Sequence, residues 1–146
     1  MERVMEWDNS LNTGIDIIDK QHQGIVEFIN KLHTASHNGD REIVGDVLTG
    51  LINYTVSHFA FEEDMHEKHG YPLAAPHKKV HEMFVEHVAS YQERHNNGED
   101  IARKLSGELV VWLGNHIKNE DKDYVPYCSK PIEKGVLSRM LGKYFK

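Results

Sequence analysis

Residues 51–62 read LINYTVSHFAFE and set two polar side chains in line with an apolar helical stripe. At helical spacing, Leu51, Thr55, His58 and Glu62 follow one another on a single face. An apolar stripe faces the core, so His58 and Glu62 should be buried. Buried imidazoles and carboxylates need partners, because an unpaired polar group in the interior costs free energy. The stretch therefore predicts a core helix that carries a functional group.

The same arrangement recurs in three other segments with helical periodicity. His22 lies in line with Ile18 and Ile25, and His116 lies in line with Leu109. The full set of buried polar groups that the stripes predict is His22, His58, Glu62, His77, His81, His116 and Asp121. A pair of bound metal ions would satisfy all of them at once.

Short breaks that contain glycine or proline separate four long helical segments. We expect these helices at about residues 15–37, 41–69, 73–95 and 100–121. Short loops make successive helices antiparallel, so the sequence predicts an all-α protein, an up-down-up-down four-helix bundle with an extended N-terminal arm. A short C-terminal helix is expected at about residues 132–144. We expect one domain over residues 1–146, with its core at about 15–124 and a C-terminal extension at about 126–146.

Composition limits the classes of partner. The net charge of -6 argues against nucleic acid or an anionic membrane as the main partner. The single cysteine, Cys128, excludes an internal disulfide and is compatible with a reducing compartment. No stretch approaches the ~20 apolar residues of a membrane span, and the first residues lack the apolar region of a secretion signal. We therefore expect a monomeric cytoplasmic protein without a membrane span.

The donor set indicates which metal is bound. Seven ligands are too many for one four-coordinate zinc, and no cysteine lies near them. Imidazole is a good ligand for iron, and carboxylate is a natural bridge. Five histidines, two bridging carboxylates and one bridging oxide or hydroxide would fill all but one of the positions of two octahedral irons. The vacant position could bind a small molecule such as O2.

One spacing departs from regular helix geometry. His116 and Asp121 are five residues apart, which turns about 140° on a regular α-helix. We therefore predict a widened turn or fraying near residues 119–121, a feature that often marks functional sites.

Not every histidine fits the site. Glu63 and His66 match the Glu-x-x-His element of ferritin-like di-iron proteins, but only one copy is present. We expect Glu63, His66 and His69 to be solvated or at the boundary of the core. The remaining histidines, His33, His37, His87 and His95, are expected on the surface, with His33 and His87 partly buried.

The sequence resembles the hemerythrins, and most closely their bacterial members. The motifs that carry this resemblance are W-x6-G-I-x2-I-D-x-Q-H at 7–22, H-F-x2-E-E at 58–63, G-Y-P at 70–72, H-x3-H at 77–81 and H-I-x3-D-x2-Y at 116–124. The resemblance covers about residues 7–124 and leaves the C-terminal tail outside.

The resemblance implies a four-helix bundle around an oxo-bridged di-iron centre that binds O2 reversibly. Carried over to this chain, one iron would be held by His77, His81 and His116, and the other by His22 and His58. Glu62 and Asp121 would bridge the two irons. The vacancy would then lie on the two-histidine iron, in agreement with the coordination count. The implied role is that of an oxygen carrier rather than an enzyme.

The apolar residues within about a turn of these ligands are candidates for lining the O2 pocket: Ile25, Phe59, Trp112 and Ile117. Two other functions remain open. One is an oxygen or redox sensor that acts on a partner through the tail. The other is a di-iron oxidoreductase acting on O2, peroxide or nitric oxide, although such enzymes are expected to use more carboxylates. A carrier would also need an electron donor to re-reduce oxidised iron, or an acceptor that consumes the O2.

Overall fold

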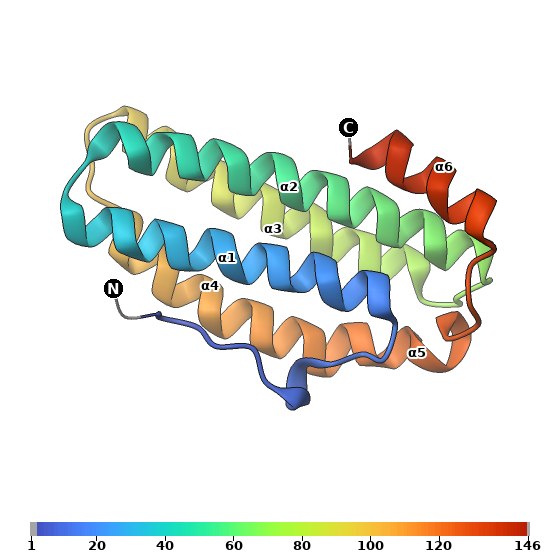
Figure 1. Cartoon of the computed structure of the whole chain (residues 1–146). Helices are drawn as coiled ribbons and strands as arrows, with labels where there is room; N and C mark the ends of the chain where they lie inside the picture. The colour runs from blue at the N-terminus through green and yellow to red at the C-terminus, as the bar shows by residue number, and fades with distance from the viewer. Residues whose placement is uncertain (1–2, 146) are drawn as a thin grey trace.

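The computed structural model describes residues 3–145 and is built from helices (Figure 1). Four long helical arms run alternately up and down, as the sequence predicts. The elements are η1 (Asn9–Leu11), α1 (Asp16–Asn38), α2 (Arg41–Lys68), α3 (Ala74–Asn96), α4 (Ala102–His116), η2 (Ile117–Asp121), α5 (Lys122–Cys128) and α6 (Lys134–Tyr144). The predicted four-helix bundle and the C-terminal helix are confirmed. No helix in residues 3–145 is long and apolar enough to cross a membrane.

Local sequence explains where the helices turn. Gly39 ends α1 with φ of 68°, a left-handed conformation that glycine adopts without a steric penalty. The next residue, Asp40, caps α2, because its carboxylate accepts a hydrogen bond from the backbone N–H of Ile43. A loop this short forces α1 and α2 to lie antiparallel and in contact.

The fourth arm is longer than expected. The sequence placed its end near Asp121, whereas the structure continues through the wide turn η2 into α5 and stops at Cys128. The prediction was wrong because the five-residue spacing widens the helix without ending it. Tyr124 and Cys128 on α5 are buried, so the extension adds a further layer to the core.

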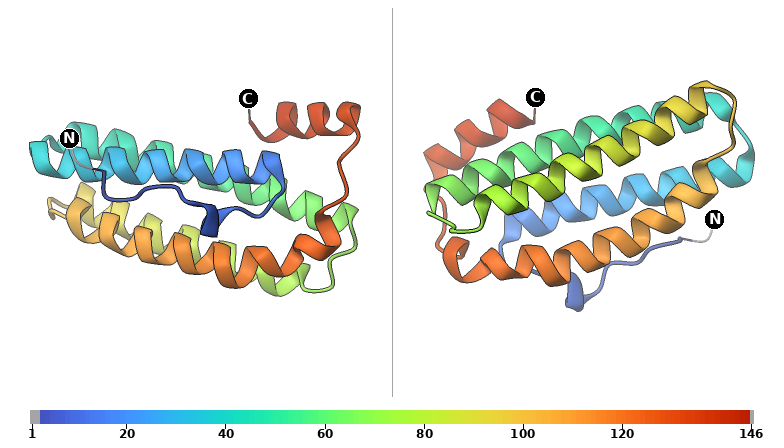
Figure 2. Two further views of the ribbon diagram at one scale, coloured as in Figure 1. Left: turned by 60° about the horizontal axis from the view of Figure 1, so that its bottom comes forward. Right: turned by 180° about the vertical axis from the view of Figure 1, so that it is seen from behind.

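Both termini pack on the bundle (Figure 2). The N-terminal arm runs along α1 and α4, where the Asn30 amide pairs with the backbone of Met5 in both directions. Trp7 is half-buried against the core. At the other end, α6 lies on α2, and Phe145 and Tyr144 contact Phe61. The arm and α6 therefore cover the bundle from opposite sides.

Candidate metal centre

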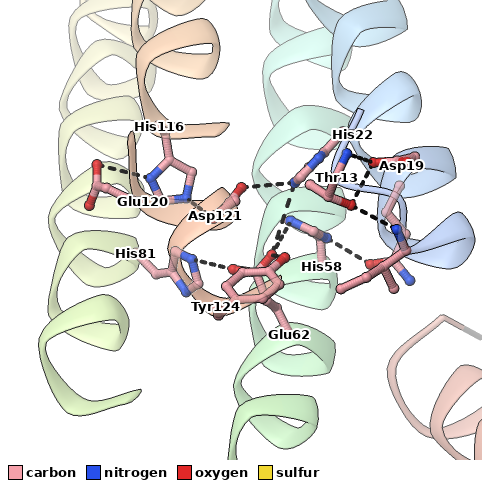
Figure 3. A network of polar contacts seen from close by, with 12 residues as sticks. Thr13, Asp19, His22, His58, Glu62, His81, His116, Glu120, Asp121 and Tyr124 are labelled. Carbon is pink, nitrogen blue, oxygen red and sulfur yellow. Dashed lines mark hydrogen bonds and ion pairs between the residues drawn. The ribbon is translucent and has the colours of Figure 1, made fainter. Parts of the chain in front are cut away.

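All four arms of the bundle contribute side chains to one buried polar cluster (Figure 3). His22 comes from α1, His58 and Glu62 from α2, His77 and His81 from α3, His116 from α4 and Asp121 from η2. Each of them is 5% exposed or less. The structure thus brings together all seven residues that the sequence singled out.

The seven residues form two groups that share a carboxylate. In the first group, the donor atoms of Glu62, His77, His81, His116 and Asp121 lie within 4.8 Å of one another. The second group contains His22, His58 and Glu62 and meets the same limit. This division into three and two histidines matches the ligand assignment that the resemblance implies.

Glu62 faces both groups of histidines. Its Oε1 lies 2.9 Å from Nε2 of His77 and 3.0 Å from Nε2 of His81. Its Oε2 lies 3.4 Å from Nε2 of His58 and 3.9 Å from Nε2 of His22. One carboxylate therefore directs one oxygen to each group, as a bridging ligand would.

Asp121 repeats this arrangement from the fourth arm. Its Oδ1 lies 3.0 Å from Nε2 of His116 and 3.1 Å from Nε2 of His77, whereas its Oδ2 lies 3.1 Å from Nε2 of His22. The wide turn makes this reach possible. Residues Ile117–Asp121 form a π-helix, in which the hydrogen bonds span five residues, so Asp121 returns to the face of His116. The predicted widened turn is confirmed.

Burial and charge set the protonation of the cluster. Burial lowers the pKa of His58 to about 3, which keeps its imidazole neutral. Burial acts in the same direction on His77, but the neighbouring Asp121 and Glu62 raise its pKa to about 9. Burial also lowers the pKa of His116, but Asp121 and Glu120 raise it to about 10. Two carboxylates in a dry site thus attract positive charge, which protons supply here.

The donor set fits metal ions better than it fits protons. Nε2 of His22, His58, His81 and His116 and both oxygens of Asp121 are buried and form no hydrogen bond within the described chain. Imidazole nitrogens and carboxylate oxygens that converge on one another are the ligands that iron and other first-row metals accept. The seven residues could therefore hold two cations.

Three imidazoles of the cluster have a polar partner at Nδ1, the ring nitrogen that points away from the cluster. The Nδ1–H of His58 donates to the amide oxygen of Gln21 at 2.7 Å. Nδ1 of His81 is hydrogen-bonded to a carboxylate oxygen of Glu63 at 2.9 Å, whereas Nδ1 of His116 lies 3.2 Å from one of Glu120 as an ion pair without hydrogen-bond geometry. Partners of this kind fix the ring and direct the other nitrogen toward a metal.

These outer contacts were not predicted, although the positions of the residues in the sequence could have indicated them. Glu120 is four residues after His116 and Gln21 directly precedes His22, so both lie beside the predicted ligands. Glu63 was set aside as a boundary residue; it is indeed partly exposed, yet it contacts a histidine of the cluster. Tyr124, quoted only as part of a motif, donates its hydroxyl hydrogen to Oε2 of Glu62 at 2.9 Å.

Comparison with known proteins agrees with this geometry. The family model described as the hemerythrin HHE cation binding domain matches residues 13–128. The chain belongs to the hemerythrin family. It is 41% identical to a bacteriohemerythrin of Stenotrophomonas maltophilia, over 97% of this chain and 98% of the relative. It is 35% identical to a bacteriohemerythrin of Methylococcus capsulatus, over 86% of this chain and 98% of the relative. A wild-type hemerythrin crystal structure superposes with a TM-score of 0.82 at 34% identity, covering 86% of this chain and 98% of that one.

Two histidines of this hemerythrin-family chain lie deeper than expected. His66 was expected to be solvated but is fully buried, with its ring 4.5 Å from that of Tyr124 and 4.7 Å from that of His77. The expectation failed because α5 covers the end of α2. His95 was expected on the surface but is 8% exposed, because it packs where Gly45 leaves room on α2.

The apolar residues proposed to line the O2 pocket lie around the cluster. Phe59 stacks on His81, with ring centroids 3.9 Å apart, and Trp112 stacks on His116 at 4.5 Å. Ile117 directly follows His116, and Ile25 is one turn from His22; both are buried. Trp112 and His116 both line an open cavity of about 830 Å³ between α3 and α4, so this cavity reaches a histidine of the cluster.

Proposed function

We propose that this protein binds O2 reversibly at a non-haem, oxo-bridged di-iron centre and acts as an oxygen carrier or store. The observation that carries the proposal is that Glu62 and Asp121 each direct one oxygen to the three-histidine group and the other to the two-histidine group. Two cations held side by side by shared carboxylates account for this arrangement.

In this proposal His77, His81 and His116 hold one iron, His22 and His58 hold the other, and Glu62 and Asp121 bridge. His22 and His58 would supply one histidine fewer than the other group and would leave room for O2 on the iron that they hold. The irons would supply the electrons that retain O2 as a ligand. Support also comes from the names of relatives, which include bacteriohemerythrins and a myohemerythrin of Riftia pachyptila that is 31% identical.

The protein's own contribution is to hold the ligands and to exclude water. Tyr124 fixes Glu62 through its hydroxyl, and burial raises the pKa of Tyr124 well above its usual range, so that hydroxyl keeps its proton. Phe59 and Ile117 are buried beside the ligands. An apolar wall disfavours the entry of water, which would otherwise promote oxidation of the irons.

We propose binding rather than turnover because the donor set is rich in imidazole. An oxidase would gain from more carboxylates, since anionic oxygen ligands stabilise the higher oxidation states of iron. Here the two carboxylates within the cluster both sit in bridging positions, and Glu63 and Glu120 contact the outer nitrogens of histidines.

The test is to load the protein with iron, reduce it without oxygen, add O2 and then remove it while recording the visible spectrum. We expect two irons per chain and an absorption band that appears with O2 and disappears on its removal. Glu62→Gln should lower the iron content, whereas Glu67→Gln, at an exposed position on the same helix, should not. Irreversible bleaching, or steady consumption of O2 with a reductant, would overturn the carrier proposal.

A further inference from the structure

A separate pair of imidazoles lies on the outer part of α1, away from the metal centre. Nε2 of His33 and Nε2 of His37 are 3.1 Å apart. We propose that this pair is a second metal site, one that binds a single late first-row divalent cation such as Cu²⁺, Ni²⁺ or Zn²⁺ through both Nε2 atoms. Of these ions, Cu²⁺ should bind most tightly, following the general order of affinity for nitrogen ligands.

The distance between the two nitrogens suits one ion. Histidine nitrogens bind such metals at about 2.0–2.1 Å. Two nitrogens at that bond length are about 2.9 Å apart if they meet the ion at a right angle and about 3.4 Å apart if they meet it tetrahedrally. The 3.1 Å between His33 and His37 lies inside this interval, so a cation could be bound with little movement of either ring.

The helix holds the pair in place before any ion arrives. Residues four apart on an α-helix project from the same face about one turn apart. Their ring centroids are 4.5 Å apart and the ring planes are at 85°. His33 is half-buried, and its Nδ1 is buried with no hydrogen-bond partner in the described chain, so a cation on Nε2 would leave the Nδ1 hydrogen unpaired and would bind less tightly for that reason. His37 is therefore the polar contact of the His33 ring, and a cation at Nε2 would replace a single shared hydrogen.

The pair is independent of the di-iron cluster. His33 is eleven residues after His22 on α1, a separation of about 16 Å along a helix. The buried side chains of Ile25, Ile29 and Leu32 fill the core over that length. No ion can be shared between the two sites, and His37 is exposed, so a cation can reach the pair from solvent.

The test uses the iron-loaded protein and Cu²⁺ alone as the probe. Calorimetric titration should show one Cu²⁺ site in the native protein that the double variant His33→Gln/His37→Gln lacks. Either single substitution should weaken Cu²⁺ binding at that site by about 100-fold. This is the low end of the gain in affinity that two linked contacts provide over one. Paramagnetic resonance of the bound Cu²⁺ should report two nitrogen ligands.

The matched control keeps two histidines but changes their spacing. In His37→Gln/Asn38→His the second imidazole moves to the fifth position after His33, about 140° around the helix. We expect this variant to bind Cu²⁺ as weakly as the single variants. If it binds as tightly as the native protein, or if the double variant keeps the site, the proposal is overturned. Iron content and the visible spectrum, measured on the same samples, separate this outcome from any failure of the di-iron centre.

Discussion

Replacing Gln21 by leucine should weaken iron binding while leaving the fold nearly as stable as before. The Gln21 amide oxygen accepts the Nδ1–H of His58 at 2.7 Å, and both residues are buried. Leucine is similar in size but cannot accept a hydrogen bond. The substitution therefore removes the partner of His58 without opening a large cavity.

The substitution should destabilise the metal-bound state more than the metal-free state. Without metal, the neutral His58 ring can carry its hydrogen on Nε2, which faces the Glu62 carboxylate with Oε2 3.4 Å away. With metal on Nε2, the hydrogen must sit on Nδ1, where leucine offers no acceptor. A buried donor without a partner costs about 1–3 kcal/mol. Loss of such an outer partner typically lowers metal affinity by about 10- to 100-fold.

The stability of the metal-free protein should change by less than about 1 kcal/mol. The native Gln21 Nε2 is itself buried with no hydrogen-bond partner, so leucine removes one unsatisfied donor while it removes one hydrogen bond. Because these two effects oppose each other, the midpoint of unfolding in urea should scarcely move. Iron affinity and folding stability thus respond differently to the same substitution.

The assay measures iron retention against a competing chelator, together with urea unfolding of the metal-free protein. Gln92→Leu is the matched control, because that amide donates to Thr49 on the outside of the bundle. The reasoning is refuted if Gln21→Leu retains iron as well as Gln92→Leu does. It is also refuted if iron loss is accompanied by an equal loss of stability in the metal-free state.

Four further predictions rest on packing and burial. Trp112→Ala should speed the oxidation of the O2-bound protein, measured by decay of its visible band, because the ring covers His116 by stacking and its loss would widen the α3–α4 cavity that reaches this histidine; an unchanged rate would remove Trp112 from this role. Gly24→Ala should destabilise the protein by about 1–3 kcal/mol, since its new Cβ would overlap the Tyr54 hydroxyl. Gly107→Ala on exposed helix surface, with no atom near its Cβ, should stabilise it by about 0.5–1 kcal/mol in the same urea assay. Cys128 should react with a thiol reagent at neutral pH only after unfolding, because burial raises its pKa to about 11; rapid labelling of the folded protein would contradict this.

The fold was predictable because each arm has its own apolar stripe and its own stop signal. Residues that recur every three or four positions define the buried face, and Gly39 marks the first turn as a left-handed glycine must. The path beyond Asp121 was not predictable in the same way. The fourth helix was expected to end near Asp121. It continues because Tyr124 and Cys128 are buried, and their burial depends on what α5 packs against.

The inner residues of the site followed from the sequence, but the outer ones did not. His22, His58 and Glu62 stand out because polar groups within an apolar stripe must be buried. Gln21 and Glu120 lie off those stripes, so their positions in the sequence do not distinguish them from glutamine and glutamate residues on the surface. Only the positions of neighbouring helices decide which of them reaches a ring nitrogen.

The outer partners make the two halves of the centre chemically different. His81 and His116, in the three-histidine group, each contact a carboxylate, from Glu63 and Glu120. His58, in the two-histidine group, contacts the neutral amide of Gln21. A carboxylate draws the Nδ1 hydrogen more strongly than an amide does and so makes Nε2 the better donor to a metal. The three-histidine half therefore supplies more ligands and more electron density. In the proposed centre, the two-histidine half would have fewer protein ligands and would therefore leave room for an additional ligand such as O2.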